Sequence, residues 1–221
     1  MNDYIIYHKM LGDIPVRNIY CAVRNYYTHA QEMGTATEIS PMYFQKALSS
    51  LSTDDKIVLP KEFKVQYELE IVLLIHKNGR NISEQDAMNH VGGIALGLDL
   101  TDRKYQTELK RKQLPWFLSK SFTGSAVVTE FDSLEEYKST PPFWLDINGA
   151  RKQTGLISEM IFSIQTLISS LSSRITLLSG DLIFTGTPKG VDYLSAGDEL
   201  VLGIGEKEKG RFTVVNRPDY I

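Results

Sequence analysis

The segment 65–75 is apolar at most positions, but two glutamates lie one residue apart within it. Side chains on a strand alternate between its faces, so Glu68 and Glu70 are predicted to point to the same side. A strand that is apolar on both faces is usually buried, and two like charges repel there unless a cation or a proton neutralises them. Because hard divalent cations prefer oxygen ligands, this pair is a candidate metal site.

Other short apolar runs, bounded by turn residues, predict further strands. These strands cover 94–100, 182–185, 199–204 and 212–215. Two Asn-Gly dipeptides favour type I′ turns. The turn at 78–79 would return the strand 69–76, and the turn at 148–149 would join 143–147 to 150–154 in a hairpin.

Three helices are predicted between the strands. Ser83 and Asp86 resemble a capping box that starts a helix through about Val91, with Gly92-Gly93 after it. A polar helix fits 103–112, before Pro115. The third spans 159–172 with Ser158 as N-cap, because apolar residues recur there at helical spacing. The segment 34–52 is less regular and is interpreted as a mobile loop, so the pattern as a whole indicates an α+β fold.

Composition narrows the function classes. The 221 residues suffice for one domain, spanning 1–221, and a net charge of −3 argues against a nucleic-acid partner. The single cysteine, Cys21, lies in an apolar run and is predicted to be core. No apolar run is long enough for a membrane helix, and no signal peptide is evident. We therefore expect a cytoplasmic protein without a membrane partner.

Asp99 strengthens the metal hypothesis, because it ends the buried-looking strand 92–99, where a carboxylate needs a partner. Three carboxylates with several waters would suit Mg²⁺ or Mn²⁺.

Two further constellations are candidates for chemistry. His29 and Glu32 are three residues apart, so on a helical turn they share a face, and Glu32 would raise the basicity of His29 for a general base. A surface pair is the alternative. Lys120, within an apolar and aromatic run, would neutralise a substrate carboxylate or enolate unless it snorkels to the surface.

In combination, these motifs resemble the fumarylacetoacetate hydrolase family, over nearly the whole chain. The similarity is greatest to its short branch of acylpyruvate hydrolases and oxaloacetate decarboxylases. The matching stretches, in order, are Arg24-Asn25-Tyr26 with His29 and Glu32, Glu68-Leu69-Glu70, 97–101 with Arg103 and Gln106, 114–116, 119–122, Asn148-Gly149, 160–163 and 180–191.

The resemblance implies roles for these residues. Glu68, Glu70 and Asp99 would be metal ligands, and His29 and Glu32 a catalytic dyad on a lid segment near 25–50. Lys120 would be the active-site lysine. The implied substrate-binding residues are Arg24, Asn25, Arg103, Gln106 and Thr187. The family fold is a mixed β-roll or barrel-like sheet with flanking helices, usually in a homodimer.

The chain also departs from the family pattern. Val23 stands where glycine is frequent, and Asp102 and Lys104 flank Arg103 in place of alanine and aspartate. Ala47 replaces a proline after Lys46. These changes leave the implied metal and lysine residues in place and affect the implied substrate site.

The implied reaction is Mg²⁺- or Mn²⁺-dependent cleavage of a C–C bond in a 2-oxo acid through a metal-bound pyruvate enolate. Acylpyruvate hydrolysis, oxaloacetate decarboxylation and keto–enol tautomerisation all fit. An isomerase/decarboxylase of aromatic (homoprotocatechuate-type) catabolism is an alternative. Metal-dependent phosphoryl transfer would need more basic residues, and a non-catalytic metal or small-molecule binding module would have no use for His29, Glu32 and Lys120.

Overall fold

The computed structural model describes residues 4–26, 40–137 and 141–217. Its largest sheet has seven strands, in the order β4-β3-β14-β8-β9-β11-β5. The strands are β3 (Ile19–Val23), β4 (Met42–Lys46), β5 (Leu51–Ser52), β8 (Leu69–Ile75), β9 (Val91–Asp99), β11 (Ala126–Val128) and β14 (Leu182–Phe184). β14 pairs parallel with β3 and antiparallel with β8, so the sheet is mixed.

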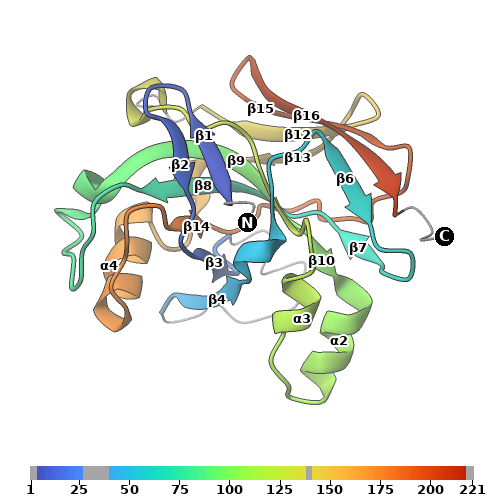
Figure 1. Cartoon of the computed structure of the whole chain (residues 1–221), viewed down its shortest axis with the longest axis horizontal. Helices are drawn as coiled ribbons and strands as arrows, with labels where there is room; N and C mark the ends of the chain where they lie inside the picture. Colours follow the sequence, from blue (N-terminus) through green and yellow to red (C-terminus); the bar gives the residue numbers. More distant parts are fainter. Residues whose placement is uncertain (1–3, 27–39, 138–140, 218–221) are drawn as a thin grey trace.

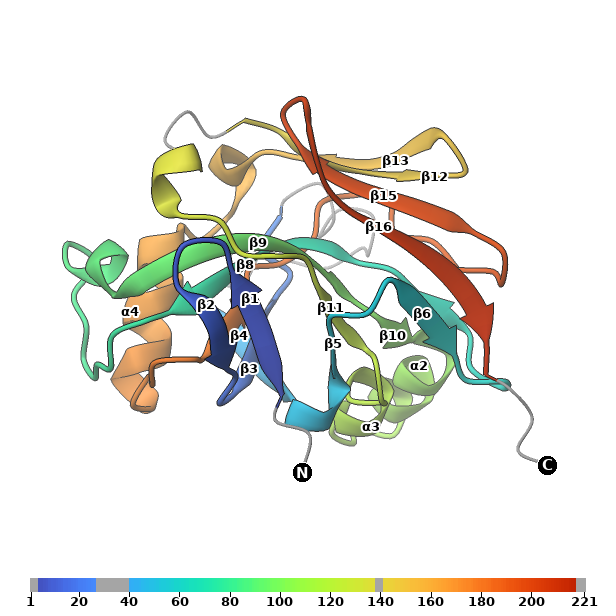
Figure 2. The ribbon, with the colours of Figure 1, turned by 45° about the horizontal axis from the view of Figure 1, so that its top comes forward.

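A five-stranded sheet lies over one face of the seven-stranded sheet (Figure 2), in the order β13-β12-β15-β16-β6. Its strands are β6 (Lys56–Leu59), β12 (Phe143–Ile147), β13 (Ala150–Gly155), β15 (Glu199–Ile204) and β16 (Lys207–Asn216). Two small sheets pair β1 (Ile5–His8) with β2 (Gly12–Pro15) and β7 (Val65–Gln66) with β10 (Thr101–Asp102). The mixed, curled sheets confirm the predicted fold class.

Among the described residues, three α-helices flank the sheets (Figure 1). They are α2 (Arg103–Arg111), α3 (Phe117–Lys120) and α4 (Ile164–Arg174). Short 3₁₀ turns cover Leu48–Ser50, Ala87–His90, Leu134–Tyr137 and Ile157–Glu159. α2 and α3 lie together at one end of the molecule, and α4 lies at the other. No helix in the described ranges has the length and apolar character needed to span a bilayer.

The central strand β8 is buried along its whole length, and it separates two apolar layers. Leu69, Ile71 and Leu73 pack in the layer shared with the five-stranded sheet. Val72 and Leu74 point the other way, toward the layer that contains Cys21, which is fully buried as predicted. Glu70 shares this second side, so its carboxylate lies in the protein interior.

Several predicted elements are confirmed. The strands β8, β14 and β15 lie where expected, and α2 matches the predicted polar helix. The Asn148-Gly149 turn has φ of 52° and 76°, as a type I′ turn requires, and it joins β12 to β13.

The prediction at 78–79 is wrong. The Gly79 peptide instead exchanges hydrogen bonds with Leu177, which precedes β14, and the positive φ falls at Asn81. The long-range pairing prevails over the local turn signal. The predicted helix from Ser83 is also incorrect. The Ser83 hydroxyl does accept from the Asp86 amide at 3.2 Å, but only a 3₁₀ turn follows.

Gly92 and Gly93 belong to β9 and do not end a helix. Glycine is needed at both positions, because a Cβ at Gly92 would collide with His76 and a Cβ at Gly93 would collide with His8. The third helix starts later than predicted. Met160 is extended, the Ile161 amide donates to the Asn25 carbonyl, and Ser163 is the N-cap of α4 in place of Ser158. Within 34–52, β4 and β5 are regular strands, so the loop interpretation is wrong for residues 42–46 and 51–52.

Candidate active site

Three buried carboxylates converge at one end of the β8–β9 pair. Glu70 lies on β8, Asp99 ends β9, and Glu68 lies just before β8, with its carbonyl accepting from the Asp99 amide at 2.9 Å. Each residue offers an oxygen within 4.8 Å of the others. Antiparallel pairing therefore brings together groups that are about 30 residues apart in the chain.

Glu70 is the least neutralised of the three. Burial raises the pKa of its carboxyl well above the usual range, and the negative charges of Asp99 and Glu68 raise it further. The Gly186 amide donates to Oε2 at 2.6 Å and opposes this shift only in part. Three carboxylates on one centre, one of them destabilised as an anion, fit a hard divalent cation such as Mg²⁺ or Mn²⁺.

Lys120 is buried against the same carboxylates, so it does not snorkel to the surface. Its ammonium lies 2.9 Å from Glu68 Oε2 and 2.6 Å from Asp99 Oδ2. Burial works against its charge, but Asp99 and Glu68 outweigh burial and raise the pKa of Lys120. These carboxylates therefore favour the ammonium form of Lys120, which supplies positive charge to the site.

A second buried lysine, Lys46 on β4, was not predicted as a site residue. Its ammonium lies 2.8 Å from Asp99 Oδ1 and donates to the carbonyls of Leu100, Ser125 and Lys120. These bonds tie β4 to the segments that carry Asp99 and Lys120. The available signal was the position of Lys46 directly before Ala47, where the family pattern that the sequence resembles has a lysine followed by proline.

Helix α2 carries Arg103 and Gln106 into the pocket. The Arg103 guanidinium donates to Gln106 Oε1 at 2.6 Å, to Gln66 Oε1 at 2.5 Å and to Glu68 Oε1. Asp102, one of the departures from the family pattern, caps this helix, since its carboxylate accepts from the Tyr105 amide at 3.2 Å. The departure thus fixes the start of the helix on which Arg103 lies.

Thr187 lies in the loop after β14 and is buried at the pocket wall. Gln153 on β13 positions it, since its amide donates to Thr187 Oγ1 and to the Pro188 carbonyl, both at 2.9 Å. The Gln153 side-chain oxygen accepts from the Leu69 amide at 2.9 Å. Sequence reasoning missed Gln153, because nothing in the polar pattern of β13 distinguishes it from its exposed neighbours.

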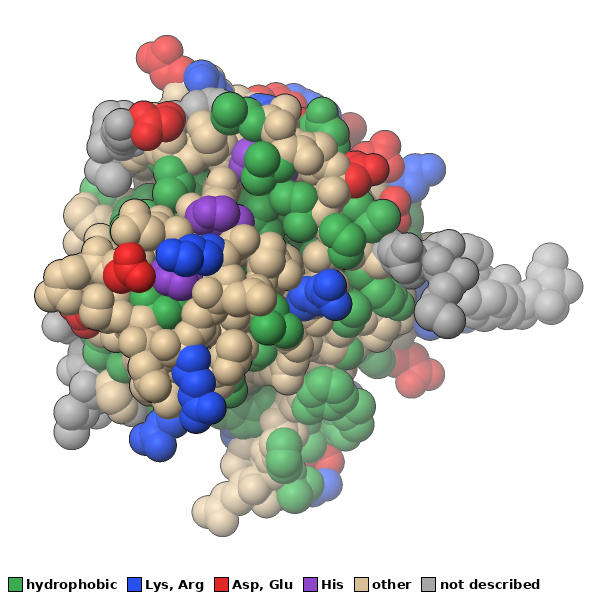
Figure 3. All heavy atoms as spheres, turned by 60° about the vertical axis from the view of Figure 1, so that its left-hand side comes forward, with side chains coloured by type: hydrophobic (Ala, Val, Ile, Leu, Met, Phe, Trp, Pro, Cys, Tyr) green, Lys and Arg blue, Asp and Glu red, His purple; other side chains and the backbone are tan. Residues whose placement is uncertain are grey.

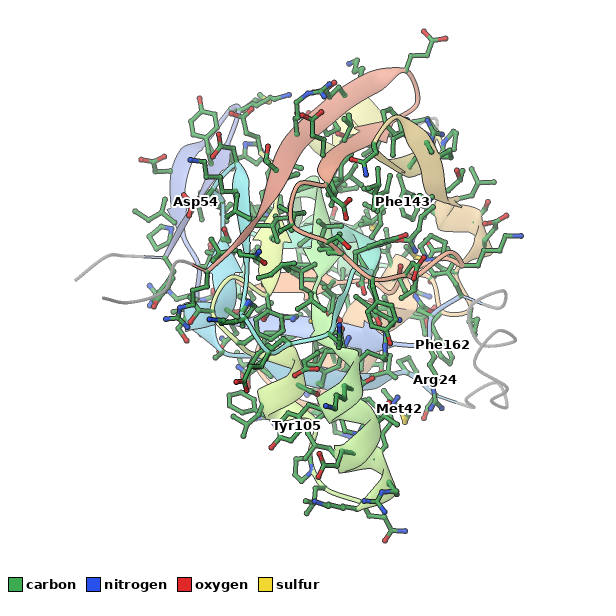
Figure 4. All side chains as sticks on the ribbon, turned by 90° about the vertical axis from the view of Figure 1, so that its right-hand side faces the viewer. Arg24, Met42, Asp54, Tyr105, Phe143 and Phe162 are labelled. Atoms are coloured by element: carbon green, nitrogen blue, oxygen red, sulfur yellow. The ribbon has the colours of Figure 1, made fainter. Side chains whose placement is uncertain are left out.

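Arg24 lines the pocket with a left-handed backbone at φ 54°, an uncommon conformation for a residue with a side chain. In Figure 4 it lies beside Met42 and Phe162, on the side of the molecule opposite Asp54. Asn25 is fully buried, and its side chain bonds the backbone of Phe162 and Thr185. These contacts indicate a positioning role for Asn25, so its predicted contact with substrate stays a prediction.

Of the predicted site residues that the structure describes, all but Asn25 line one pocket. Its wall includes Arg24, Glu68, Glu70, Asp99, Arg103, Gln106, Lys120 and Thr187, together with Phe44, Lys110 and Trp116, which were not predicted. His29 and Glu32 lie outside the described residues, so the dyad stays a prediction.

The fold and this pocket define a protein with a buried carboxylate–ammonium centre at the end of a mixed sheet. A family model described as fumarylacetoacetate (FAA) hydrolase C-terminal matches residues 18–215. The chain belongs to this family.

Relatives and solved structures support the assignment. The chain is 41% identical to the mitochondrial oxaloacetate tautomerase FAHD1 of Mus musculus over 208 residues, 92% of this chain and 94% of the relative. It is 37% identical to a mitochondrial oxaloacetate decarboxylase of Dictyostelium discoideum, covering 85% and 88%. A crystal structure of fumarylpyruvate hydrolase from Pseudomonas aeruginosa in complex with Mn²⁺ and pyruvate superposes with a TM-score of 0.89 at 31% identity, covering 96% and 95%.

Proposed function

We propose that this protein is a Mg²⁺- or Mn²⁺-dependent enzyme that acts on 2-oxo acids, with oxaloacetate as its main substrate. The carrying observation is the buried cluster of Glu68, Glu70 and Asp99, in which the Glu70 anion has no adequate counter-charge. The relatives named for oxaloacetate are more similar in sequence than the fumarylpyruvate hydrolase. Acylpyruvate hydrolysis is the second candidate, supported by the structural likeness to that hydrolase.

The three carboxylates would hold the cation. A bound divalent cation would act as a Lewis acid that stabilises negative charge on the 2-oxo oxygen. Lys120 adds a second positive charge next to Glu68 and Asp99, where an enolate oxygen develops. Arg103, held by Gln66 and Gln106, and Thr187, held by Gln153, orient the substrate carboxylate.

The proposed reactions share an enolate of a 2-oxo acid and differ in what leaves or enters. Decarboxylation and hydrolysis pass through the enolate of pyruvate, and tautomerisation passes through the enolate of oxaloacetate. Decarboxylation of oxaloacetate breaks the C3–C4 bond and releases CO₂, and a proton then enters at C3. Tautomerisation moves a proton between C3 and the 2-oxo oxygen. Hydrolysis of an acylpyruvate also needs an activated water, which is the role proposed for His29 with Glu32.

The first experiment measures pyruvate release from oxaloacetate and from acetylpyruvate, and decay of enol-oxaloacetate absorbance. Each is run with Mg²⁺, with Mn²⁺ and with EDTA. Metal-dependent turnover of oxaloacetate supports the proposal, and a higher rate with acetylpyruvate would make hydrolysis the main activity. No turnover of either substrate, with metal bound, would overturn it in favour of the aromatic-catabolism branch or a binding role.

Two substitutions distinguish the role of the metal-binding carboxylates from the role of the His29–Glu32 dyad. Asp99→Ala is expected to abolish every activity together with Mn²⁺ binding, measured by calorimetry. His29→Ala should lower acylpyruvate hydrolysis by about 10²–10⁴-fold while Mn²⁺ still binds, because hydrolysis, unlike decarboxylation, needs a base that activates the attacking water. Full activity of Asp99→Ala without added metal would contradict the ligand assignment.

The assembly and the compartment belong to the same proposal. We expect one catalytic domain over 1–221, with a lid near 25–50, in a homodimer. Exposed apolar side chains on the β1–β2 hairpin, among them Tyr7, Met10 and Leu11, support an interface. Hydrophobic side chains also gather on the face shown in Figure 3. Light scattering would test the dimer.

A cytoplasmic location remains a prediction, and the cited FAHD1 relative is mitochondrial by name.

A further inference from the structure

Lys110 is a charged pocket residue to which the proposed reaction assigns no role. It lies on α2, and its spacing from Arg103 and Gln106 is seven and four residues, so all three share one helix face. That face lines the pocket that contains Glu68, Glu70 and Asp99. The Lys110 ammonium lies over the Trp116 ring, 4.7 Å from its centroid, which holds the side chain at the pocket wall.

Lys110 differs from Arg103, Lys120 and Lys46 in its interaction partners. Arg103, Lys120 and Lys46 are each paired with a carboxylate of the cluster. Within the three described ranges, no carboxylate forms an ion pair with Lys110. Burial, and next the positive charges of Arg103 and Arg24, lower the pKa of Lys110 to about 8. An anion that enters the pocket would stabilise this half-buried ammonium, which lies among like charges.

The charge balance of the pocket agrees with a second anionic group. Among the described residues, Arg24, Arg103, Lys110 and Lys120 line it together with three carboxylates, and a divalent cation would add two further positive charges. The carboxylate of a simple acylpyruvate offsets only one of these. A dicarboxylic 2-oxo acid supplies a second negative charge at the end remote from its 2-oxo group.

We propose that Lys110 binds the second carboxylate of a dicarboxylic 2-oxo acid, and so makes the enzyme prefer such substrates to monocarboxylic acylpyruvates. The inference rests on the proposed function, because it assigns a specificity residue to the same site. Lys110 has no role in bond breaking here. It orients the remote end of the substrate while Lys120 and the metal ligands act on the 2-oxo end.

The test compares oxaloacetate with acetylpyruvate for the wild type, Lys110→Met and Lys110→Arg. Lys110→Met keeps the stem on Trp116 and removes the charge. It is expected to lower kcat/KM for oxaloacetate by about 10–100-fold, mainly through KM, as loss of a charge-assisted hydrogen bond implies. For acetylpyruvate the change should stay within about threefold. Lys110→Arg should restore most of the preference, since it restores the charge.

Lys112→Met is the matched control, since it removes an exposed lysine from the end of the same helix, where its partner is Glu108. It should leave both substrates unchanged. An equal loss on both substrates in Lys110→Met, or no loss, would overturn the inference. Thermal unfolding shows whether Lys110→Met is folded. If Lys110→Met is misfolded, Lys110→Gln takes its place in the comparison.

The wild-type rates test the proposed function separately from the preference. If the wild type turned over neither substrate, the proposed function would fail. The Lys110 inference would then be tested by thermal shift with Mn²⁺ and either oxaloacetate or pyruvate. Stronger stabilisation by oxaloacetate that disappears in Lys110→Met supports it, and a difference that persists in the variant overturns it.

Discussion

At the scale of single residues, Glu70 lowers the stability of the metal-free fold and provides a carboxylate for a divalent cation. Its carboxylate is buried near Asp99 and Glu68, and burial followed by these charges raises its pKa. In the metal-free protein this shift favours the protonated form of Glu70, in which the proton neutralises the carboxylate in place of a cation. A neutral side chain of the same shape should suit the metal-free fold better than the native glutamate does.

Glu70→Gln is accordingly expected to raise the Tm of the metal-free protein by about 2–4 °C, which corresponds to about 1 kcal/mol in a chain of this size. The same substitution should abolish Mn²⁺ binding and activity. The folded-state pKa is raised, so the native carboxyl favours folding most at acid pH, and the advantage of the variant should grow as pH rises. Calorimetric scans at several pH values with EDTA check this. A lower Tm for Glu70→Gln at every pH would contradict it.

The lowered pKa of Lys110 predicts a pH-dependent substrate preference. Burial and the facing charges of Arg103, Arg24 and Lys120 lower it to about 8, while Glu68 opposes them. Above that pH the ammonium loses its proton, so the ratio of kcat/KM for oxaloacetate over acetylpyruvate should fall between pH 7 and 9. The ratio cancels groups that act on both substrates. In Lys110→Arg it should stay flat, because guanidinium does not titrate in this range.

At the scale of elements, helix α2 places Arg103, Gln106 and Lys110 on the pocket, so its start must be fixed. Asp102 provides the cap through the Tyr105 amide. Asp102→Ala should cost about 0.5–2 kcal/mol, whereas Asp102→Asn should cost less, because asparagine is an equally good cap. Thermal unfolding measures both. If both variants lost the same stability, the charge of Asp102 would matter more than the cap.

The elements that sequence predicts best are those fixed by local patterns. The Asn148-Gly149 hairpin and the apolar strands β8, β14 and β15 follow from turn chemistry and continuous hydrophobicity. The errors occur where distant contacts decide. Gly79 pairs with Leu177, and Met160–Ile161 is held extended by contacts with Tyr26 and Asn25, so neither local signal prevails.

The candidate site likewise contains residues that local sequence patterns indicate and residues that only the folded structure brings together. Carboxylates within apolar strands indicated Glu68, Glu70 and Asp99, because a buried charge needs a partner. Lys46, Lys110 and Gln153 reach the site from a strand, a helix end and a second sheet, and their own segments do not distinguish them from surface residues. Motif resemblance contributed Arg103, Gln106 and Thr187, which local patterns alone did not single out.

At the scale of the whole molecule, Gln153 connects the two sheets at the site. It lies on β13 of the five-stranded sheet, is buried, and bonds both the start of β8 and the loop of Thr187 and Pro188. The position of Thr187 relative to the three clustered carboxylates therefore depends on how the sheets pack. Loss of this link should loosen the substrate side of the pocket and leave the carboxylates in place.

Gln153→Met keeps the volume of the side chain and removes its amide. The Leu69 amide and the Pro188 carbonyl lose buried partners, so we expect a loss of about 1–3 kcal/mol in the free energy of unfolding. KM for oxaloacetate should rise, while Mn²⁺ affinity changes by less than about threefold, since the amide does not touch the carboxylates. The neighbouring Lys152→Met, on the exposed side of β13, should alter neither quantity. A parallel loss of Mn²⁺ affinity in Gln153→Met would mean that the sheet packing also sets the geometry of the carboxylates, and a normal KM would mean that Thr187 is positioned by its own loop.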